Sequence, residues 1–524
     1  MLFVDLAAAS AAVAAVGGRR DKVALLADAL RRLDPDEVAA GAGYLAGELR
    51  QRRTGVGGAG LRDLPPPAQV ATLTVAAVDA AVDAVAAVAG AGSQRLRRAR
   101  LAALYAAATA PEQRLLTGLF FGELRQGAQA GLLADAIARA AAVPAAAVRR
   151  ALLLTGDIRA VAVAALAGGA AALAAVALEV GRPLAPMLAG SAPDIEAGLA
   201  ATGVPAVVDT KLDGVRVQVH RRGREVAVFS RSLADVTARL PGVAAAVRDL
   251  PGGDLVLDGE AVLRDATGRP RAFQDTAGRA ATSGPADAGD PLVPYFFDLL
   301  HADGADLIDT PGAGRWAALA DLVPAALRVG RDTVTGPGQA AGFFAAALAG
   351  GHEGVVLKSP QAPYEVGRRG GAWVKVKPRH TLDLVVLAVE RGHGRRQGWL
   401  SNLHLGAREP ATGGFVMLGK TFKGLSDATL RWQTERFTAL AVGEERGVVR
   451  VRPEQVVEVA FDGVQRSTRY PGGVALRFAR VLRYREDKTA AEADTIDEVR
   501  ALRPPGSVAP TGVAVGRAGE RGAS

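Results

Sequence analysis

The sequence of 524 residues contains no cysteine. Disulfide bridges, a thiol nucleophile and cysteine-ligated zinc or iron–sulfur sites are therefore excluded. Histidine is also scarce, and the six histidines form no HExxH pattern, which argues against a histidine-based metal cage. Charged residues account for 22% and hydrophobic residues for 49%, a balance typical of globular proteins that excludes wholesale disorder.

Lysine is rare among the basic residues. Of 63 lysines and arginines only eight are lysines, which leaves 55 arginines, and seven of the lysines lie after residue 210. The few lysines are candidates for work that arginine cannot do, because lysine can lose its proton and attack an electrophile. The formal net charge of +9 fits a polyanionic partner such as nucleic acid.

The sequence also lacks a convincing targeting or membrane segment. The start, MLFVDLAAAS, has no basic n-region and does not resemble a signal peptide. Residues 161–178 carry no charge over 18 positions, but alanine and glycine dominate this run. We expect a buried helix or helix pair there, no membrane partner and a cytoplasmic location.

Composition and periodicity predict several domains in one chain, at roughly 150 residues per domain. Residues 1–190 show helical spacing, as in LLADALRRL at 25–33, and predict an all-α domain of about ten helices. Residues 191–379 alternate β-type runs with helical stretches near 234–249, 315–328 and 338–349, and predict an α+β domain. Residues 380–502 are richer in strands and predict a small all-β barrel, and residues 503–524 predict a disordered tail.

One lysine lies in a short segment whose residue types suit nucleophilic chemistry. Lys211 is followed by Leu212, Asp213, Gly214, Val215 and Arg216, so a lysine at a strand end precedes an Asp-Gly turn and an arginine. Nearby cations and partial burial favour the neutral, nucleophilic amine, and the arginine side chain can hold a phosphate. Taken alone, this segment fits a plain hairpin that carries a solvated lysine somewhat better than a nucleophile.

Six further segments decide between these interpretations. The segment Lys211-x-Asp-Gly-x-Arg216 resembles motif I of the covalent nucleotidyltransferases, the superfamily of DNA ligases, RNA ligases and mRNA capping enzymes. Six later segments resemble the other motifs and follow in the order of that superfamily. They are Phe229-Ser230-Arg231, Asp258-Gly259-Glu260, Phe296-Phe297-Asp298, residues 353–358, residues 373–377, and Arg477-Phe478-Ala479-Arg480 continuing to Arg485-Glu486-Asp487-Lys488.

The resemblance favours the ATP-dependent DNA ligases. The helical first third resembles the DNA-binding domain of these ligases, and residues 392–405 and 419–424 resemble their OB-fold domain. NAD-dependent ligases carry a four-cysteine zinc module, which this chain cannot form, and capping enzymes lack the helical domain. The implied architecture is an all-α DNA-binding domain, an α+β nucleotidyltransferase (adenylation) domain and an all-β OB-fold domain.

The resemblance implies a reaction in three steps. Lys211 attacks the α-phosphate of ATP and forms lysyl-AMP, the AMP passes to the 5′-phosphate of a nick, and the 3′-hydroxyl then displaces AMP. The implied cofactors are ATP and Mg²⁺ or another divalent cation such as Mn²⁺. The implied partner is nicked double-stranded DNA, bound by a monomer in the nucleoid.

The resemblance also assigns nucleotide contacts. Asp209 is expected to accept from the adenine amino group, although related ligases usually carry the longer glutamate there, and a structural role stays open. Phe297 is expected to stack on adenine or to lie in the core, and Phe296 to lie in the core. The remaining ATP contacts implied are Arg216, Arg231, Glu260, Lys358, Arg369 (with Arg368 as a competitor), Lys375 and Lys377.

Three more groups of residues complete the expected site. Glu260 and Glu353 are the expected supports of the divalent cation. Motif VI contributes the residues expected to orient pyrophosphate, namely Arg477, Asp487 and Lys488. Arg125, Lys420 and Lys423 are expected to contact DNA, although a surface-loop role of the two lysines is an alternative.

Two other functions remain to be distinguished from DNA ligation. The first is an RNA ligase or a capping-type nucleotidyltransferase, which shares the motifs. The second is a catalytically inactive DNA-binding scaffold, against which the complete motif set argues. Formation of an adenylylated enzyme separates the scaffold from both enzymes, and the accepted nucleic acid separates the enzymes from each other.

Overall fold

A computed structural model describes the chain apart from residues 52–53, 91, 125, 128–129, 282–290 and 504–524. The chain divides into two compact units, Met1–Ala185 and Pro186–Ser524, which are considered separately below. The tail predicted to be disordered lies outside the described residues from 504 onward. Among the described residues, no helix combines the length and the apolar character needed to span a membrane.

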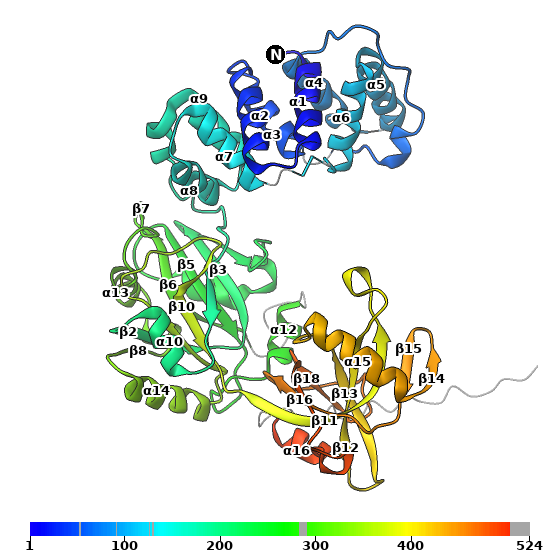
Figure 1. The fold of residues 1–524 in the computed structure, drawn as a ribbon. Helices are drawn as coiled ribbons and strands as arrows, with labels where there is room; N and C mark the ends of the chain where they lie inside the picture. The colour runs from blue at the N-terminus through cyan, green and yellow to red at the C-terminus, as the bar shows by residue number, and fades with distance from the viewer. Residues whose placement is uncertain (52–53, 91, 125, 128–129, 282–290, 504–524) are drawn as a thin grey trace, which may run out of the picture. The chain divides into compact units, whose positions relative to one another are not determined.

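The first unit is helical, as the sequence predicts (Figure 1). Its described residues form nine α-helices and one short 3-10 helix: α1 (Phe3–Ala15), α2 (Arg19–Arg31), α3 (Val38–Ala46), η1 (Gly58–Leu61), α4 (Val75–Ala86), α5 (Ser93–Ala107), α6 (Ala110–Phe121), α7 (Ala130–Ala141), α8 (Ala145–Thr155) and α9 (Ile158–Ala174).

Local signals explain where these helices begin and bend. The Thr74 hydroxyl accepts a hydrogen bond from Ala77 N at 3.0 Å and caps α4. Thr109 and Glu112 form a capping box at the start of α6. The uncharged run at 161–178 falls largely in α9, which is broken at Gly169 (φ 60°, ψ −148°), so it is a helix pair.

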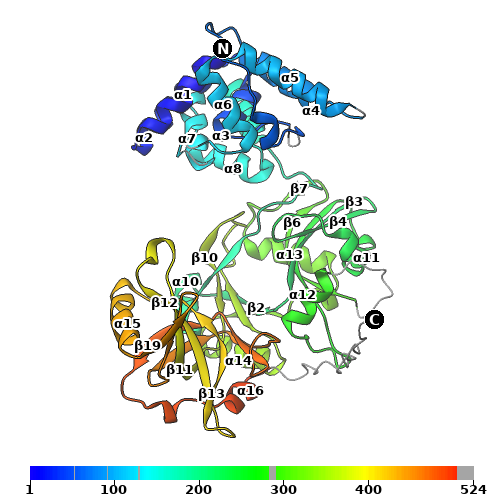
Figure 2. The ribbon, with the colours of Figure 1, turned by 90° about the vertical axis from the view of Figure 1, so that its right-hand side faces the viewer.

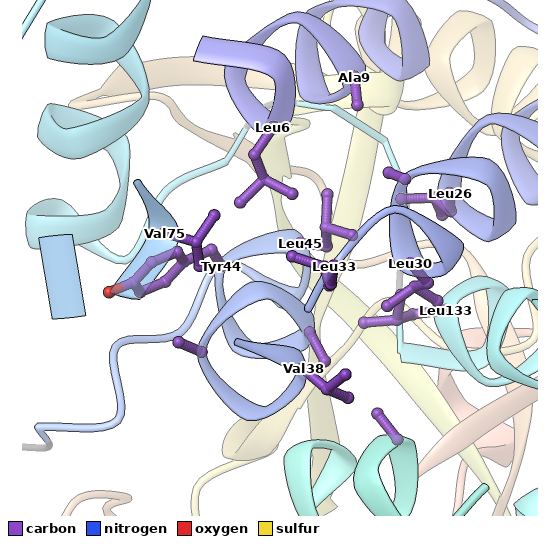
Figure 3. Close-up of a cluster of buried hydrophobic side chains, with 14 of the residues drawn as sticks. Leu6, Ala9, Leu26, Leu30, Leu33, Val38, Tyr44, Leu45, Val75 and Leu133 are labelled. Atoms are coloured by element: carbon purple, nitrogen blue, oxygen red, sulfur yellow. The ribbon is translucent and has the colours of Figure 1, made fainter. Parts of the chain in front are cut away.

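A single apolar core joins the helices of the first unit (Figure 3). Leu6 of α1, Leu26 and Leu30 of α2, Leu45 of α3 and Leu133 of α7 are all almost completely buried. Within one helix the buried residues, such as Leu26 and Leu30 of α2, recur at the three- and four-residue spacing that places them on one face. Burial of this shared face holds the short helices together, since each alone would be marginal in water.

The second unit contains two five-stranded sheets in its first half. The first sheet has the order β1-β10-β9-β2-β8 and the second has the order β4-β3-β5-β6-β7. The strands of the first sheet are β1 (Leu188–Ser191), β2 (Ala206–Lys211), β8 (Arg331–Val334), β9 (Gly354–Lys358) and β10 (Arg369–Val376). The strands of the second sheet are β3 (Val215–Arg222), β4 (Glu225–Ser230), β5 (Leu255–Val262), β6 (Val293–Ala302) and β7 (Ala305–Asp306).

Helices cover both sheets. Helices α11 and α13 pack on the second sheet (Figure 2), whereas α10 and α14 pack on the first. The elements are α10 (Ile195–Thr202), η2 (Thr237–Arg239), α11 (Pro241–Arg248), α12 (Phe273–Ala281), α13 (Gly312–Leu322), η3 (Ala325–Leu327) and α14 (Pro337–Ala349). The predicted helical stretches at 234–249, 315–328 and 338–349 match α11, α13 and α14, but no pattern predicted α10 or α12.

The rest of the second unit is a β-rich domain. Seven strands form one sheet in which β11 (His380–Arg391) pairs with β12, β15 and β16. The other elements are η4 (Gly394–Arg396), β12 (Leu400–Glu409), β13 (Gly414–Thr421), α15 (Asp427–Ala439), β14 (Ala441–Glu445), β15 (Val448–Val451), β16 (Val456–Phe461), β17 (Gly463–Arg466), β18 (Val474–Arg477), β19 (Arg480–Arg485), η5 (Ala490–Glu492) and α16 (Ile496–Ala501).

A buried arginine anchors the loop between α11 and β5. Arg221 on β3 is only 2% exposed. Its guanidinium donates to the backbone carbonyls of Val247, Leu250, Pro251, Gly252 and Gly253. The side chain thereby ties the end of α11 to the loop that follows it, because one buried guanidinium binds five backbone carbonyls.

We predict that Arg221→Met lowers the free energy of unfolding by about 3 kcal/mol, because several carbonyls lose their donor at once. Chemical denaturation of both proteins measures this difference. The matched control is Arg224→Met, since Arg224 lies close by but its side chain is 83% exposed. Equal stability of the two variants would contradict the anchoring role.

Candidate active site

A pocket of about 130 Å³ lies between the two five-stranded sheets. The first sheet contributes side chains of β2, β9 and β10, and the second contributes side chains of β3, β5 and β6. The turn 212–214 connects β2 with β3 and therefore crosses from one sheet to the other. The residues that line the pocket are Ala189, Asp209, Thr210, Lys211, Leu212, Arg216, Glu260, Phe297, Val329, Val356, Lys358 and Trp373.

Three adjacent strand ends place two lysines beside one carboxylate. Lys211 at the end of β2 pairs in register with Gly354, the first residue of β9, and Glu353 N donates to Lys211 O at 3.1 Å. Glu353 accepts hydrogen bonds from Lys211 Nζ on one oxygen and from Lys377 Nζ on the other. Lys377 Nζ also lies 2.9 Å from Asp462 Oδ2.

Electrostatics at this end of the pocket follow from the paired charges. Burial alone would raise the pKa of Glu353, but Lys211 and Lys377 hold that pKa below its usual range. Burial and the cations Lys377 and Lys211 lower the pKa of Lys375. The carboxylate of Glu353 is therefore ionised at neutral pH, and cations crowd around it.

Two glycines permit the close approach of these strands. Gly354 has φ +144°, and a Cβ there would overlap the backbone of Val376 and Lys377. A Cβ on Gly214 would overlap Ala261 O and lie 2.9 Å from Glu260 Cγ. Glycine is needed at both positions because no side chain fits between the backbones.

Arg216 is held rigidly at the opening of β3. Its guanidinium forms a bidentate pair with Asp258 (3.0 and 2.6 Å) and donates to Met187 O at 2.7 Å. The Tyr364 hydroxyl donates to the same Asp258 at 2.6 Å. The guanidinium carbon also lies 5.2 Å from the centroid of the Phe297 ring, so Arg216 has one defined orientation in the pocket.

Asp209 lies in a buried cluster of two cations. Arg331 donates to its two oxygens at 2.6 and 2.7 Å, and Lys358 Nζ lies 2.7 Å from Oδ2. Burial would raise the pKa of Asp209, but Lys358 and Arg331 hold it below its usual value. Burial lowers the pKa of Lys358, whose ammonium lies 4.0 Å from the centroid of the Trp373 ring.

Phe297 and Glu260 belong to the second sheet. The Phe297 ring lines the pocket and meets Trp373 edge to face at 5.9 Å, whereas Phe296 is completely buried in the core, as alternation along the strand predicts. Burial raises the pKa of Glu260 to about 7, and the nearby Lys211 and Arg216 limit the rise. Burial therefore favours the protonated form of Glu260 far more than that of an exposed glutamate.

Other predicted nucleotide contacts lie at the margin. Arg231 is exposed in the turn after β4. Arg369 is exposed and donates to Ala189 O at 2.8 Å, whereas Arg368 N donates to Glu365 O. Lys375 shares a strand face with Trp373 and lies within electrostatic reach of Lys211. Roles of these residues in nucleotide binding stay predictions.

Motif VI splits in the structure. Arg477 forms an ion pair with Asp213 of the Lys-x-Asp-Gly segment, at 2.6 Å. Asp487 instead pairs with Arg485, and Lys488 pairs with Asp383 at 2.7 Å, so both bind inside the β-rich domain. This arrangement brings Arg477 beside the pocket but does not bring Asp487 or Lys488 there, because neighbouring charges of their own domain hold them.

The predicted DNA contacts have different surroundings. Lys420 pairs with Glu390, and the exposed Lys423 lies 5.3 Å from the centroid of the Phe478 ring. Arg125 lies outside the described residues.

The carboxylates fit a weakly coordinated divalent cation. Among the described residues, no three or more acidic or histidine side chains gather to form a metal site by themselves. Glu353 is ionised, and Glu260 faces the same pocket. Mg²⁺ commonly takes one or two carboxylates and fills its other positions with water and substrate phosphates. The donor set therefore suits a metal that arrives with a nucleotide.

Comparison with known proteins decides the family. Residues 186–377 match the ATP dependent DNA ligase domain, residues 396–488 match the ATP dependent DNA ligase C terminal region, and residues 62–138 match the DNA ligase N terminus. A protein named Probable DNA ligase from Kineococcus radiotolerans is 60% identical over 96% of this chain and 100% of its own length.

The chain belongs to the ATP-dependent DNA ligase family. A second relative of the ligase, Probable DNA ligase from Mycolicibacterium paratuberculosis, is 59% identical over 96% of this chain and 98% of its own. The solved structure Pmar-Lig_PreS3 is 18% identical with a TM-score of 0.53, and the match covers 92% of the ligase and 99% of that chain. This likeness shows a shared fold.

The sequence did not predict the residues that orient the side chains of the ligase pocket. Arg331 and Tyr364 lie outside the motifs, and Arg331 is one of 55 arginines. Asp258 stands inside a motif but received no role. An arginine four residues after a short 3-10 helix, at the start of a strand that no pattern predicted, carries no local signal, because its partner Asp209 is 122 positions away.

We predict that Gly214→Ala reduces self-adenylylation of the ligase at least about 100-fold, because the added methyl group displaces the turn that carries Lys211. Labelling with α-labelled ATP measures the rate. The control is Gly342→Ala in α14, where the structure leaves open space around the added Cβ. Equal labelling of the two variants would contradict the tight approach at Gly214.

Proposed function

We propose that Lys211 is the residue that carries AMP in this ligase. The observation that carries the proposal is the row of Lys211, Glu353 and Lys377 at the strand ends that border the pocket. A lysine must be neutral to attack, and the carboxylate of Glu353 is the hydrogen-bond acceptor at its amine. The cations Lys375 and Lys377 are placed to bind the phosphates that Lys211 attacks.

The proposed chemistry is displacement at phosphorus in each of three steps. The Lys211 nitrogen forms a bond to the α-phosphorus of ATP, the bond to the β-phosphate oxygen breaks, and pyrophosphate leaves. The 5′-phosphate of the nick then takes the AMP from Lys211. The 3′-hydroxyl finally attacks that phosphate, and AMP leaves. Orientation and charge neutralisation supply most of the acceleration in such steps.

We assign the other end of the pocket to the nucleoside. The Phe297 ring is placed to stack on adenine, and Asp209 is placed to accept from its amino group. Glu260, with a pKa near neutrality, is placed beside the ribose, where a carboxyl group can accept or donate a hydrogen bond. Arg216 is placed to hold the phosphate that links these two ends.

Glu260 and Glu353 would hold a divalent cation, Mg²⁺ or Mn²⁺. Such an ion would neutralise phosphate charge during the displacement. The contribution of the chain itself is to keep both carboxylates near Lys211, Glu353 at the start of β9 and Glu260 on β5.

We propose the domain division 1–190, 191–379 and 380–502, with the last domain an OB fold. In this arrangement Arg477 of the OB fold reaches Asp213 beside Lys211, which supports a role in orienting pyrophosphate in the first step. Asp487 and Lys488 remain candidates for the same role in another arrangement of that domain. Domain closure of this kind would gate the chemical step.

We propose that the ligase acts as a monomer on nicked duplex DNA in the nucleoid. A nick-sealing enzyme contacts phosphates and sugars rather than base sequence, so basic side chains carry the binding. Lys423 is exposed and placed to contact the DNA backbone. Lys420 forms an ion pair with Glu390, so a DNA phosphate would compete with that carboxylate for it. Arg125 is a further candidate from the helical domain.

We predict that Lys211→Ala abolishes covalent labelling by α-labelled ATP with Mg²⁺, measured by denaturing electrophoresis after pyrophosphatase treatment. The loss should exceed about 1,000-fold because the nucleophile is removed. Lys22→Ala is the control, since Lys22 lies in the helical unit and binds backbone carbonyls. Labelling that persists in Lys211→Ala would disprove the assignment.

The same assay separates the alternative functions. Labelling by ATP but not GTP, followed by sealing of nicked DNA but not nicked RNA, supports the DNA ligase against an RNA ligase or a capping-type enzyme. Absence of labelling in the wild-type protein would support the inactive scaffold.

We predict that Arg477→Ala slows self-adenylylation roughly 10- to 100-fold, because a charged hydrogen bond near the leaving pyrophosphate is lost. Sealing of a nick that already carries AMP should change much less. The matched control is Arg483→Ala, whose side chain pairs with Glu458 within the β-rich domain. Equal slowing of both reactions would contradict a role specific to the first step.

A further inference from the structure

One arginine that does not line the pocket holds together the two strands that form its nucleoside end. Arg331 opens β8 and lies opposite Asp209 of β2 in the register of the first sheet. Its Nε and Nη2 donate to the two oxygens of Asp209 at 2.6 and 2.7 Å, a parallel fork. The planar guanidinium suits this geometry, which a lysine cannot reproduce.

The same guanidinium also reaches the second sheet. Arg331 Nη2 donates to Phe297 O on β6 at 2.8 Å. The backbone beside it makes the same connection, because Val329 N donates to Phe296 O at 3.1 Å and Thr210 N donates to Gly330 O at 2.8 Å. Arg331 therefore joins Asp209 of one sheet to Phe297 of the other.

A third contact keeps the guanidinium from rotating. Its carbon lies 4.6 Å from the centroid of the Trp316 ring, and the side chain is 21% exposed. Cation–π contact and the bidentate pair together leave one orientation. Asp209 itself is 3% exposed, so its carboxylate depends on these neighbours for compensation of its charge.

A count of acceptor positions shows what Asp209 can still bind. A carboxylate offers about four lone-pair positions. On Oδ2, Arg331 Nη2 and Lys358 Nζ both approach at 2.7 Å, whereas Oδ1 is contacted by Arg331 Nε. One acceptor position of Oδ1 is left, and Asp209 lines the pocket. The arginine thus determines which oxygen is available to a ligand.

We propose that Arg331 is a positioning residue that sets the base selectivity of the nucleotide pocket, by aiming one oxygen of Asp209 and fixing its spacing from the Phe297 ring. The proposal rests on the proposed function, in which this end of the pocket holds adenine. The ligand feature that would be recognised is an exocyclic amino group at position 6 of a purine.

The phosphate end of the pocket is held by different residues. Among the contacts of the described residues, none joins Arg331 to Lys211, Glu353 or Lys377. Loss of Arg331 should therefore weaken nucleotide binding and selectivity while leaving the chemical step at saturating ATP almost intact. Loss of general stability would instead affect every nucleotide equally.

The experiment measures self-adenylylation of the full chain with ATP and with purine riboside triphosphate, which lacks the 6-amino group. In wild type, kcat/KM for ATP should exceed that for the analogue roughly 10- to 100-fold, as expected for one hydrogen bond to a charged group. In Arg331→Gln, the KM for ATP should rise by about tenfold or more, kcat should change less than about threefold, and the preference for ATP should nearly vanish.

Two further variants make the result specific. Asp209→Asn should lose the same preference, and the double variant should be no worse than either single one, because both act through one contact. Arg331→Lys should restore stability but only part of the selectivity. Arg328→Gln is the matched control, since it removes a guanidinium from the same segment. The described contacts of Asp209 and Phe297 include Arg331 but not the Arg328 side chain.

The outcomes separate the two proposals. If wild type is not labelled by ATP at all, the proposed function fails and the selectivity is not at issue. If wild type is labelled and prefers ATP, but Arg331→Gln keeps that preference or loses activity equally with both nucleotides, the role of Arg331 is disproved. If Arg331→Gln does not fold, Arg331→Lys and Asp209→Asn carry the same comparison.

Discussion

The carboxylate of Glu353 between Lys211 and Lys377 is the interaction on which the site depends. Two ammonium groups this close would repel each other in a partly buried pocket, and the carboxylate offsets that repulsion. The backbone delivers all three side chains, because β2 and β10 end, and β9 begins, at the same edge of one sheet. Gly354 makes this possible, since a Cβ there would overlap the neighbouring strand.

The second constraint is that the pocket lies between two sheets rather than on one. The turn 212–214 carries the chain from the first sheet to the second directly after Lys211. Lys211 and Lys358 therefore face Arg216, Glu260 and Phe297 across the gap. The two walls are tied at both ends of the pocket, by the turn itself beside Lys211 and by Arg331 between Asp209 and Phe297. In the proposed function, these separate ties divide binding of the base from chemistry at the phosphate.

Prediction from sequence was strongest where the signal is local. The helical first third, the alternation of Phe296 and Phe297, and the helices α11, α13 and α14 follow from patterns a few residues long. Prediction was weakest for α12 and for the partners of motif residues. Asp487 and Lys488 bind Arg485 and Asp383 of their own domain, a competition between neighbours that the motif does not reveal.

By itself the sequence determined the reaction class, and it predicted the nucleophile. Lysine is rare here, and Lys211 stands in an ordered set of segments that resembles one superfamily. Only the tertiary structure decided which charges meet. The pairs Asp209–Arg331, Asp258–Arg216 and Asp213–Arg477 join residues 122, 42 and 264 positions apart. Such pairs arise from sheet register and domain packing. The motifs mark Arg216 and Arg477 but not the carboxylate that each one binds, and among 55 arginines no local pattern marks Arg331.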